Sequence, residues 1–149
     1  MYWFRNSKKL TTSQWREKIY NMKGPAPKKI LIVEDEDLLI EMYEDVFERA
    51  GFEVFLATTP QEALEQTKRA RPDLILLDIL LPQESGITFL KLKQDVPELA
   101  SIPVLAFSNF DDPAMKAQAR QYGAEDYLIK TNYTPEELLA RVRQYIHTE

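Results

Sequence analysis

Polar side chains stand directly after four short apolar runs of this chain. They are Glu34 with Asp35, then Asp78, Ser108 and Lys130. Carboxylates that meet at one place raise one another's pKa unless a cation is present, and such oxygen ligands suit Mg²⁺, which binds through few carboxylates. A carboxylate beside Mg²⁺, an ammonium and a hydroxyl can accept a phosphoryl group, because that transfer depends mainly on positioning and charge neutralisation. This chemistry requires a fold that brings the four places together.

The apolar runs predict the strands of such a fold. Leu74 to Leu77 shows no alternation with polar residues, which is typical of a strand covered on both faces of a parallel sheet. Five runs of this kind alternate with segments of helical spacing: 30–33, 52–57, 74–77, 102–107 and 126–129. We therefore predict an α/β domain with helices on both faces of a parallel sheet, since parallel strands need crossovers. The strand ends then share one edge, where ligands bind in open α/β sheets.

Helix-start signals support this alternation. Prolines stand at the expected first helical positions, each behind a residue that can cap a helix: Pro60 behind Thr58 or Thr59, Pro113 behind Asp111 or Asp112, and Pro135 behind Thr134. Thr134 and Glu137 also have the spacing of a capping box. The last helix is therefore predicted to start at Pro135.

Composition excludes several other kinds of site. The 149 residues are 44% apolar, enough for one domain with a single core. The chain has no cysteine, so disulfides, thiolate zinc sites and cysteine nucleophiles are excluded. Its one histidine, His147, stands near the end, which argues against a histidine triad or a multi-histidine metal site. No apolar segment is long enough for a membrane span, and we expect a cytoplasmic protein.

Charge divides the chain into residues 1–27, an N-terminal extension with linker, and residues 28–149, the folded domain. Residues 1–29 carry a net charge of +7 and residues 30–149 a net charge of −12, so the sequence does not favour nucleic acid as a partner of the domain. The extension is either disordered or a short helix over 12–22 with Trp15, Ile19 and Met22 on one face. It is interpreted either as an extension without a function or as an arm that contacts a protein, a membrane surface or nucleic acid.

Over residues 28–149 the chain resembles the receiver domain of bacterial two-component response regulators, and its layout is similar to that of the single-domain chemotaxis regulator. The matching segments are 29–37, 74–82 with Gly86, 102–108 and 123–130. The resemblance implies a flavodoxin-like, doubly wound (βα)5 fold whose five parallel strands have the order 2-1-3-4-5.

The resemblance also implies roles for individual residues. It assigns the phosphoacceptor to Asp78, the Mg²⁺ ligands to Glu34, Asp35, Asp78 and the backbone carbonyl of Leu80, and the phosphate contacts to Ser108 and Lys130. Tyr127 is implied to be a switch aromatic that moves inward when Ser108 is drawn to the phosphoryl group. The alternative for Tyr127 is a partly buried strand tyrosine.

Three positions depart from the family pattern. Thr131 follows Lys130 where family members usually have proline, commonly across a cis bond, and a cis bond before a residue other than proline costs about 3 kcal/mol. Leu80 and Phe110 are apolar where the family often has polar groups that help or admit the hydrolytic water. We therefore predict a comparatively long-lived phosphoryl group on Asp78.

The expected function is a stand-alone receiver that takes a phosphoryl group from a sensor histidine kinase or phosphotransfer protein. Phosphorylation is expected to switch a face around Tyr127 and the last helix toward a downstream protein, in a monomer or a phosphorylation-dependent dimer. Such a domain is a phosphoacceptor rather than an enzyme, catalysing its own phosphorylation and slow autodephosphorylation at most. Two alternatives are a pseudo-receiver that works without phosphorylation, supported by Thr131, and a Mg²⁺-dependent phosphohydrolase, which normally has an acid where Leu80 stands.

Overall fold

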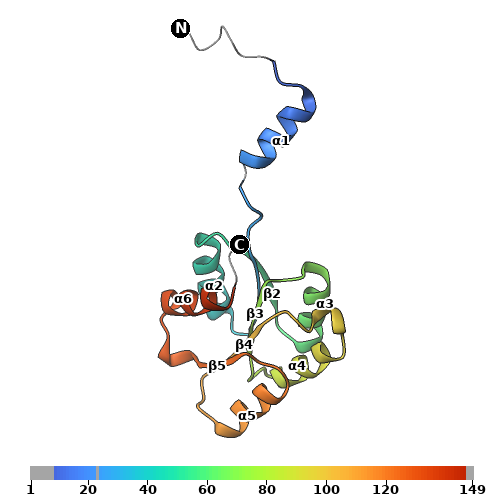
Figure 1. Cartoon of the computed structure of the whole chain (residues 1–149). Helices are drawn as coiled ribbons and strands as arrows, with labels where there is room; N and C mark the ends of the chain where they lie inside the picture. Colours follow the sequence, from blue (N-terminus) through green and yellow to red (C-terminus); the bar gives the residue numbers. More distant parts are fainter. Residues whose placement is uncertain (1–8, 23, 147–149) are drawn as a thin grey trace.

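The computed structural model describes residues 9–22 and 24–146, so the first eight residues and His147 lie outside the described part. Its centre is a five-stranded sheet of order β2-β1-β3-β4-β5 in which every neighbouring pair is parallel. The strands are β1 (Lys29–Val33), β2 (Glu53–Ala57), β3 (Leu74–Asp78), β4 (Val104–Ser108) and β5 (Asp126–Ile129). The predicted fold class and strand order are confirmed (Figure 1).

Among the described residues, five helices follow the five strands and one helix precedes them. They are α1 (Thr12–Met22), α2 (Asp37–Arg49), α3 (Pro60–Ala70), α4 (Gly86–Gln94), α5 (Pro113–Gln121) and α6 (Pro135–Tyr145), with short 3₁₀ turns η2 (Pro97–Leu99) and η3 (Lys130–Asn132). Three of these helices, α3, α5 and α6, begin at the prolines that the capping signals predict. Thr59 caps α3 and Asp112 caps α5, which selects one residue from each predicted pair. The capping box of Thr134 and Glu137 is present at the start of α6.

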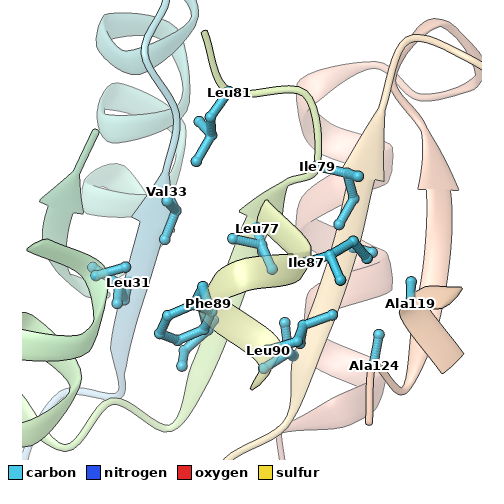
Figure 2. Packing of buried hydrophobic residues seen from close by; sticks show 14 of the residues in the cluster. Leu31, Val33, Leu77, Ile79, Leu81, Ile87, Phe89, Leu90, Ala119 and Ala124 are labelled. Atoms are coloured by element: carbon cyan, nitrogen blue, oxygen red, sulfur yellow. The ribbon is translucent and has the colours of Figure 1, made fainter. Parts of the chain in front are cut away.

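Alternate residues of the central strands supply two cores on opposite faces of the sheet. Leu31 and Leu77 belong to the core beneath α3, α4 and α5, which Figure 2 shows. Ile32 and Leu76 belong to the core beneath α2 and α6. Because both faces are buried, each central strand must be apolar at every position, which explains the unbroken runs in the sequence. The pairing of the strands in this sheet determines the positions of their carboxyl ends relative to one another.

Some boundaries and burials differ from the sequence-based expectation. β4 starts at Val104 rather than at residue 102, because Pro103 lacks the N–H that a strand interior needs. Met42 shares the helical spacing of the α2 core residues, yet it is 36% exposed, while Tyr43 and Phe47 are buried. Periodicity alone does not separate the edge of a helix face from its centre.

Helix α1 stands apart from the sheet (Figure 1) and buries none of its residues. The structure contains the short helix over residues 12–22, which is one of the two interpretations of this segment. In the described ranges, the helices are all too short or too polar to cross a membrane.

Candidate functional site

The carboxyl ends of two neighbouring strands bring the three predicted acidic residues together. Asp78 ends β3, and Glu34 and Asp35 follow β1 directly. The register pairs Val33 of β1 with Leu77 of β3, so these acids leave adjacent strands at the same level. Carboxylate oxygens of the three acids lie within 4.8 Å of one another. Glu34 and Asp78 are almost completely buried, so water screens their charges poorly.

Lys130 reaches the same place from the end of β5. Its Nζ donates to Oε2 of Glu34 at 2.7 Å and to Oδ2 of Asp78 at 3.1 Å, and its side chain is only 7% exposed. The bond between Lys130 and Thr131 is trans, and η3 begins at Lys130. The departure at Thr131 therefore does not keep the ammonium from the acids.

Charge at the site is only partly balanced, because one ammonium faces two buried carboxylates. Burial raises the pKa of Glu34, with a further rise from the charge of Asp78, and the hydrogen bond from Lys130 offsets this only in part. Burial lowers the pKa of Lys130, but the hydrogen bond to Glu34 and the charge of Asp78 outweigh it and raise that pKa above its usual value. The site therefore favours the arrival of further positive charge.

Two aromatic residues that the sequence analysis did not single out support Lys130. The Lys130 Nζ lies 5.3 Å from the centre of the Phe107 ring, within the range of a cation–π interaction. Tyr43 of α2 packs edge-on against that ring, with 5.6 Å between ring centres. Burial raises the pKa of Tyr43, followed by the charges of Glu34 and Asp78. In the sequence both aromatics look like ordinary core residues, and only the position of Phe107 directly before Ser108 gives a hint.

The loop after β3 folds back against the phosphoacceptor candidate. A Cβ at Gly86 would lie 2.3 Å from the backbone oxygen of Asp78, so only glycine allows this approach. The backbone N–H of Leu80 donates to Oδ1 of Asp78 at 2.9 Å, which fixes the carboxylate orientation. The side chains of Leu80 and Phe110 are 43% and 60% exposed. Both apolar groups stand on the loops that follow Asp78 and Ser108.

Ser108 and Tyr127 are both tied to the backbone of Phe110. The Ser108 side chain is fully buried, and its Oγ accepts from the Phe110 N–H at 3.2 Å. The Tyr127 hydroxyl donates to the Phe110 carbonyl at 3.0 Å, and the residue is 7% exposed. The Tyr127 side chain is thus already buried in this structure. Because Ser108 and Tyr127 are both hydrogen-bonded to the backbone of Phe110, a movement of Ser108 can be transmitted to Tyr127 through this residue.

The donor set fits Mg²⁺. Three carboxylates on adjacent strand ends offer the hard oxygen ligands that this ion takes, and their separations allow them to share one ion. Their incomplete neutralisation by Lys130 gives the electrostatic reason to bind it.

Comparison with known proteins agrees with this geometry. Residues 30–143 match the family model described as "Response regulator receiver domain". The chain is 36% identical over 120 residues to the polar-differentiation response regulator DivK of Brucella anthropi, covering 80% of this chain and 97% of that protein. DivK of Brucella ovis is 34% identical, with 80% and 96% covered.

Solved structures give the same result. The chemotaxis protein CheY4 of Vibrio cholerae matches with a TM-score of 0.75 and 29% identity, covering 80% of this chain and 99% of that one. A chain described as a response regulator from Chloroflexus aurantiacus has a TM-score of 0.73 and 37% identity, with 80% and 98% covered. With its sheet order, its acidic strand ends and these relatives, the chain belongs to the response regulator receiver family of two-component signalling.

Proposed function

We propose that the domain accepts a phosphoryl group on Asp78 from a sensor histidine kinase or phosphotransfer protein, and that it signals by changing the surface around Tyr127 and α6. The observation that carries this proposal is the meeting of Glu34, Asp35, Asp78 and Lys130 at one sheet edge. A purely structural use of two buried acids and a buried lysine is hard to reconcile with the cost of burying their charges.

The residues divide the work of the transfer. An oxygen of the Asp78 carboxylate attacks phosphorus, the bond from phosphorus to the donor's histidine nitrogen breaks, and an acyl phosphate forms on Asp78. Glu34 and Asp35, together with Asp78 and the Leu80 carbonyl, would hold Mg²⁺, which supplies positive charge for the phosphoryl oxygens. The Lys130 ammonium, which donates to Asp78 in this structure, would contact an oxygen of the phosphoryl group carried by that carboxylate.

Signal output would use the backbone link at Phe110. If the Ser108 side chain rotates so that its hydroxyl donates to a phosphoryl oxygen, its Oγ moves away from the Phe110 N–H from which it accepts. The Phe110 carbonyl accepts from the Tyr127 hydroxyl, so a shift of this loop alters the packing of Tyr127 in the core beneath α5. A downstream protein that reads this surface would then bind one state better than the other.

The test is incubation with acetyl phosphate and Mg²⁺ followed by intact mass measurement. We expect an adduct of about 80 Da, one phosphoryl group, on the wild-type chain and none on Asp78→Asn. Asp95→Asn, the same change at an exposed position at the end of α4, is the matched control and should be modified normally. An unmodified wild-type chain would instead support a pseudo-receiver that works without phosphorylation.

A further inference from the structure

Large apolar side chains are exposed in two groups within the described residues. One group lies on α1 and consists of Trp15, Ile19, Tyr20 and Met22. The other lies on α2 and the nearby loops and consists of Leu38, Met42, Leu80 and Phe110. Leu80 and Phe110 belong to the site described above, which leaves one exposed apolar surface on α1 and one on α2.

The α1 surface is an apolar stripe with basic edges. Trp15, Ile19 and Met22 recur at helical spacing and share one face, which we call the α1 stripe. Arg16 and Lys18 flank this face on its two sides. All five side chains are exposed, because α1 buries none of its residues. Such a helix, 11 residues long, is marginally stable without a partner.

The α2 surface has the opposite charge. Leu38 is 75% exposed and Met42 is 36% exposed, and the two lie one turn apart along the helix. Asp45 already forms an exposed ion pair with Arg49 at 2.9 Å, so docking at this acid has to compete with that pair. Glu41 and Asp45 stand beside Leu38 and Met42 and are also exposed. We call these four residues the α2 stripe. With 13 residues against 11, α2 is long enough to cover α1 along its whole length.

We propose that the α1 stripe of one molecule docks lengthwise on the α2 stripe of a second copy. The apolar side chains of the two stripes would then be buried together. One basic flank of the α1 stripe, Arg16 or Lys18, would lie against Glu41 and Asp45, which share one side of the α2 stripe. The overall charges support this pairing, because residues 1–29 carry +7 and residues 30–149 carry −12. Opposite potentials of this kind favour association and set its orientation.

The connection between α1 and β1 favours a second copy over the same molecule. Pro25 and Pro27 stand in this connection, and prolines favour an extended backbone of about 3.1 Å per residue. An extended spacer directs α1 away from its own domain, in line with its position in Figure 1. In a two-fold dimer each molecule offers its α1 to the other, so the contact forms twice.

The first experiment measures mass and the environment of Trp15 together. Trp3→Phe leaves Trp15 as the only tryptophan, because the chain has two. Light scattering should show a change from monomer to dimer as concentration rises, and Trp15 emission should shift to the blue over the same concentrations. Added salt should move both midpoints to higher concentration, since the paired charges are screened.

The second experiment exchanges the charges. Arg16→Glu with Lys18→Glu should weaken the dimer by at least about tenfold, equivalent to about 1.4 kcal/mol. Glu41→Lys with Asp45→Lys should weaken it similarly, and a chain carrying all four changes should dimerise again. Lys68→Glu with Arg69→Glu on α3 makes the same change of net charge at two exposed positions elsewhere and should leave the dimer intact.

Four results would overturn the proposal. The first is a monomer at every concentration, and the second is a monomer whose Trp15 emission is blue-shifted at every concentration, which would show that α1 contacts its own domain. The third is a blue shift of Trp15 emission that appears only when vesicles of anionic lipid are added. The fourth is a dimer that both pairs of charge reversals leave intact. Restoration by the combined four changes separates a direct contact between the stripes from a general effect of net charge.

Discussion

At the scale of single residues, two apolar side chains should govern how long the phosphoryl group stays on Asp78. Leu80 and Phe110 stand on the loops that follow Asp78 and Ser108, and neither can hold a water molecule by a hydrogen bond. Leu80→Asn should therefore speed loss of the phosphoryl group on the order of tenfold, about 1.4 kcal/mol of barrier. Decay of the mass adduct with time measures this. A wild-type adduct lost within seconds would contradict the prediction.

Phe107 should matter through its contact with Lys130 rather than through packing alone. Phe107→Leu removes the ring 5.3 Å from the Lys130 ammonium, an interaction worth up to about 2 kcal/mol when buried. Phosphorylation by acetyl phosphate should slow by about tenfold.

The matched control for Phe107 is Phe89→Leu, the same change at a fully buried position in the other core. Both variants should lose about 1 kcal/mol of unfolding free energy from packing, measured in urea, and Phe107→Leu should lose more because its contact with Lys130 is also removed. Only Phe107→Leu should slow the reaction. Equal rates in the two variants would show that the ring contributes packing only.

At the scale of elements, Asp126 joins the start of β5 to α6. Its carboxylate forms an ion pair with Arg141 and accepts from the Tyr145 hydroxyl at 2.8 Å. Burial raises the pKa of Asp126, but the hydrogen bonds from Arg141 and Tyr145 outweigh it and hold that pKa below the ordinary 3.8. A carboxylate whose pKa is lower in the folded chain than in the unfolded chain stabilises the fold at pH values above its pKa in the unfolded chain. This stabilisation is lost as the pH falls through the pKa of the carboxylate in the folded chain.

Asp126→Asn should consequently lower the free energy of unfolding by about 1 kcal/mol at pH 7. The difference from wild type should stay constant down to about 3.8 and shrink at lower pH. Urea unfolding at several pH values measures it, with exposed Asp95→Asn as the control. A difference that grows on acidification would show the opposite linkage.

The elements themselves could be predicted from the sequence because their signals are local. Unbroken apolar runs indicate strands buried on both faces, and Thr134 with Glu137 determines a helix start from four residues. The acidic part of the site was also predictable, since parallel strands end at one edge. The sheet register then placed Asp78 beside the acids that follow β1.

Other features could not be predicted because they depend on contacts between distant residues. The ring of Phe107 lies beside Lys130 only once β4 and β5 are paired. The inward position of Tyr127 depends on the backbone of Phe110, 17 residues away. Met42 shows the converse, because its spacing matches the core while its place at the edge of the buried helix face leaves it 36% exposed.

At the scale of the whole molecule, residues 28–149 should fold without the extension. Helix α1 buries none of its residues, so its removal should change the free energy of unfolding of the dilute protein by less than about 0.5 kcal/mol. Urea unfolding of the full chain and of residues 28–149 compares the two. A much less stable short chain would show that the extension supports the domain.

Because a single ammonium is shared by two buried carboxylates, the unfolding equilibrium should depend on dissolved Mg²⁺. The acids of the sheet edge meet only in the folded chain, so Mg²⁺ should bind the folded chain and raise its melting temperature. At a free Mg²⁺ concentration one hundred times the dissociation constant, the free energy of unfolding should rise by about 2.7 kcal/mol. Asp35→Asn should lose most of this gain and Asp95→Asn none. A titration of melting temperature against free Mg²⁺ then gives the affinity of the site without any phosphoryl donor, and a flat titration would show that the acids hold no such ion.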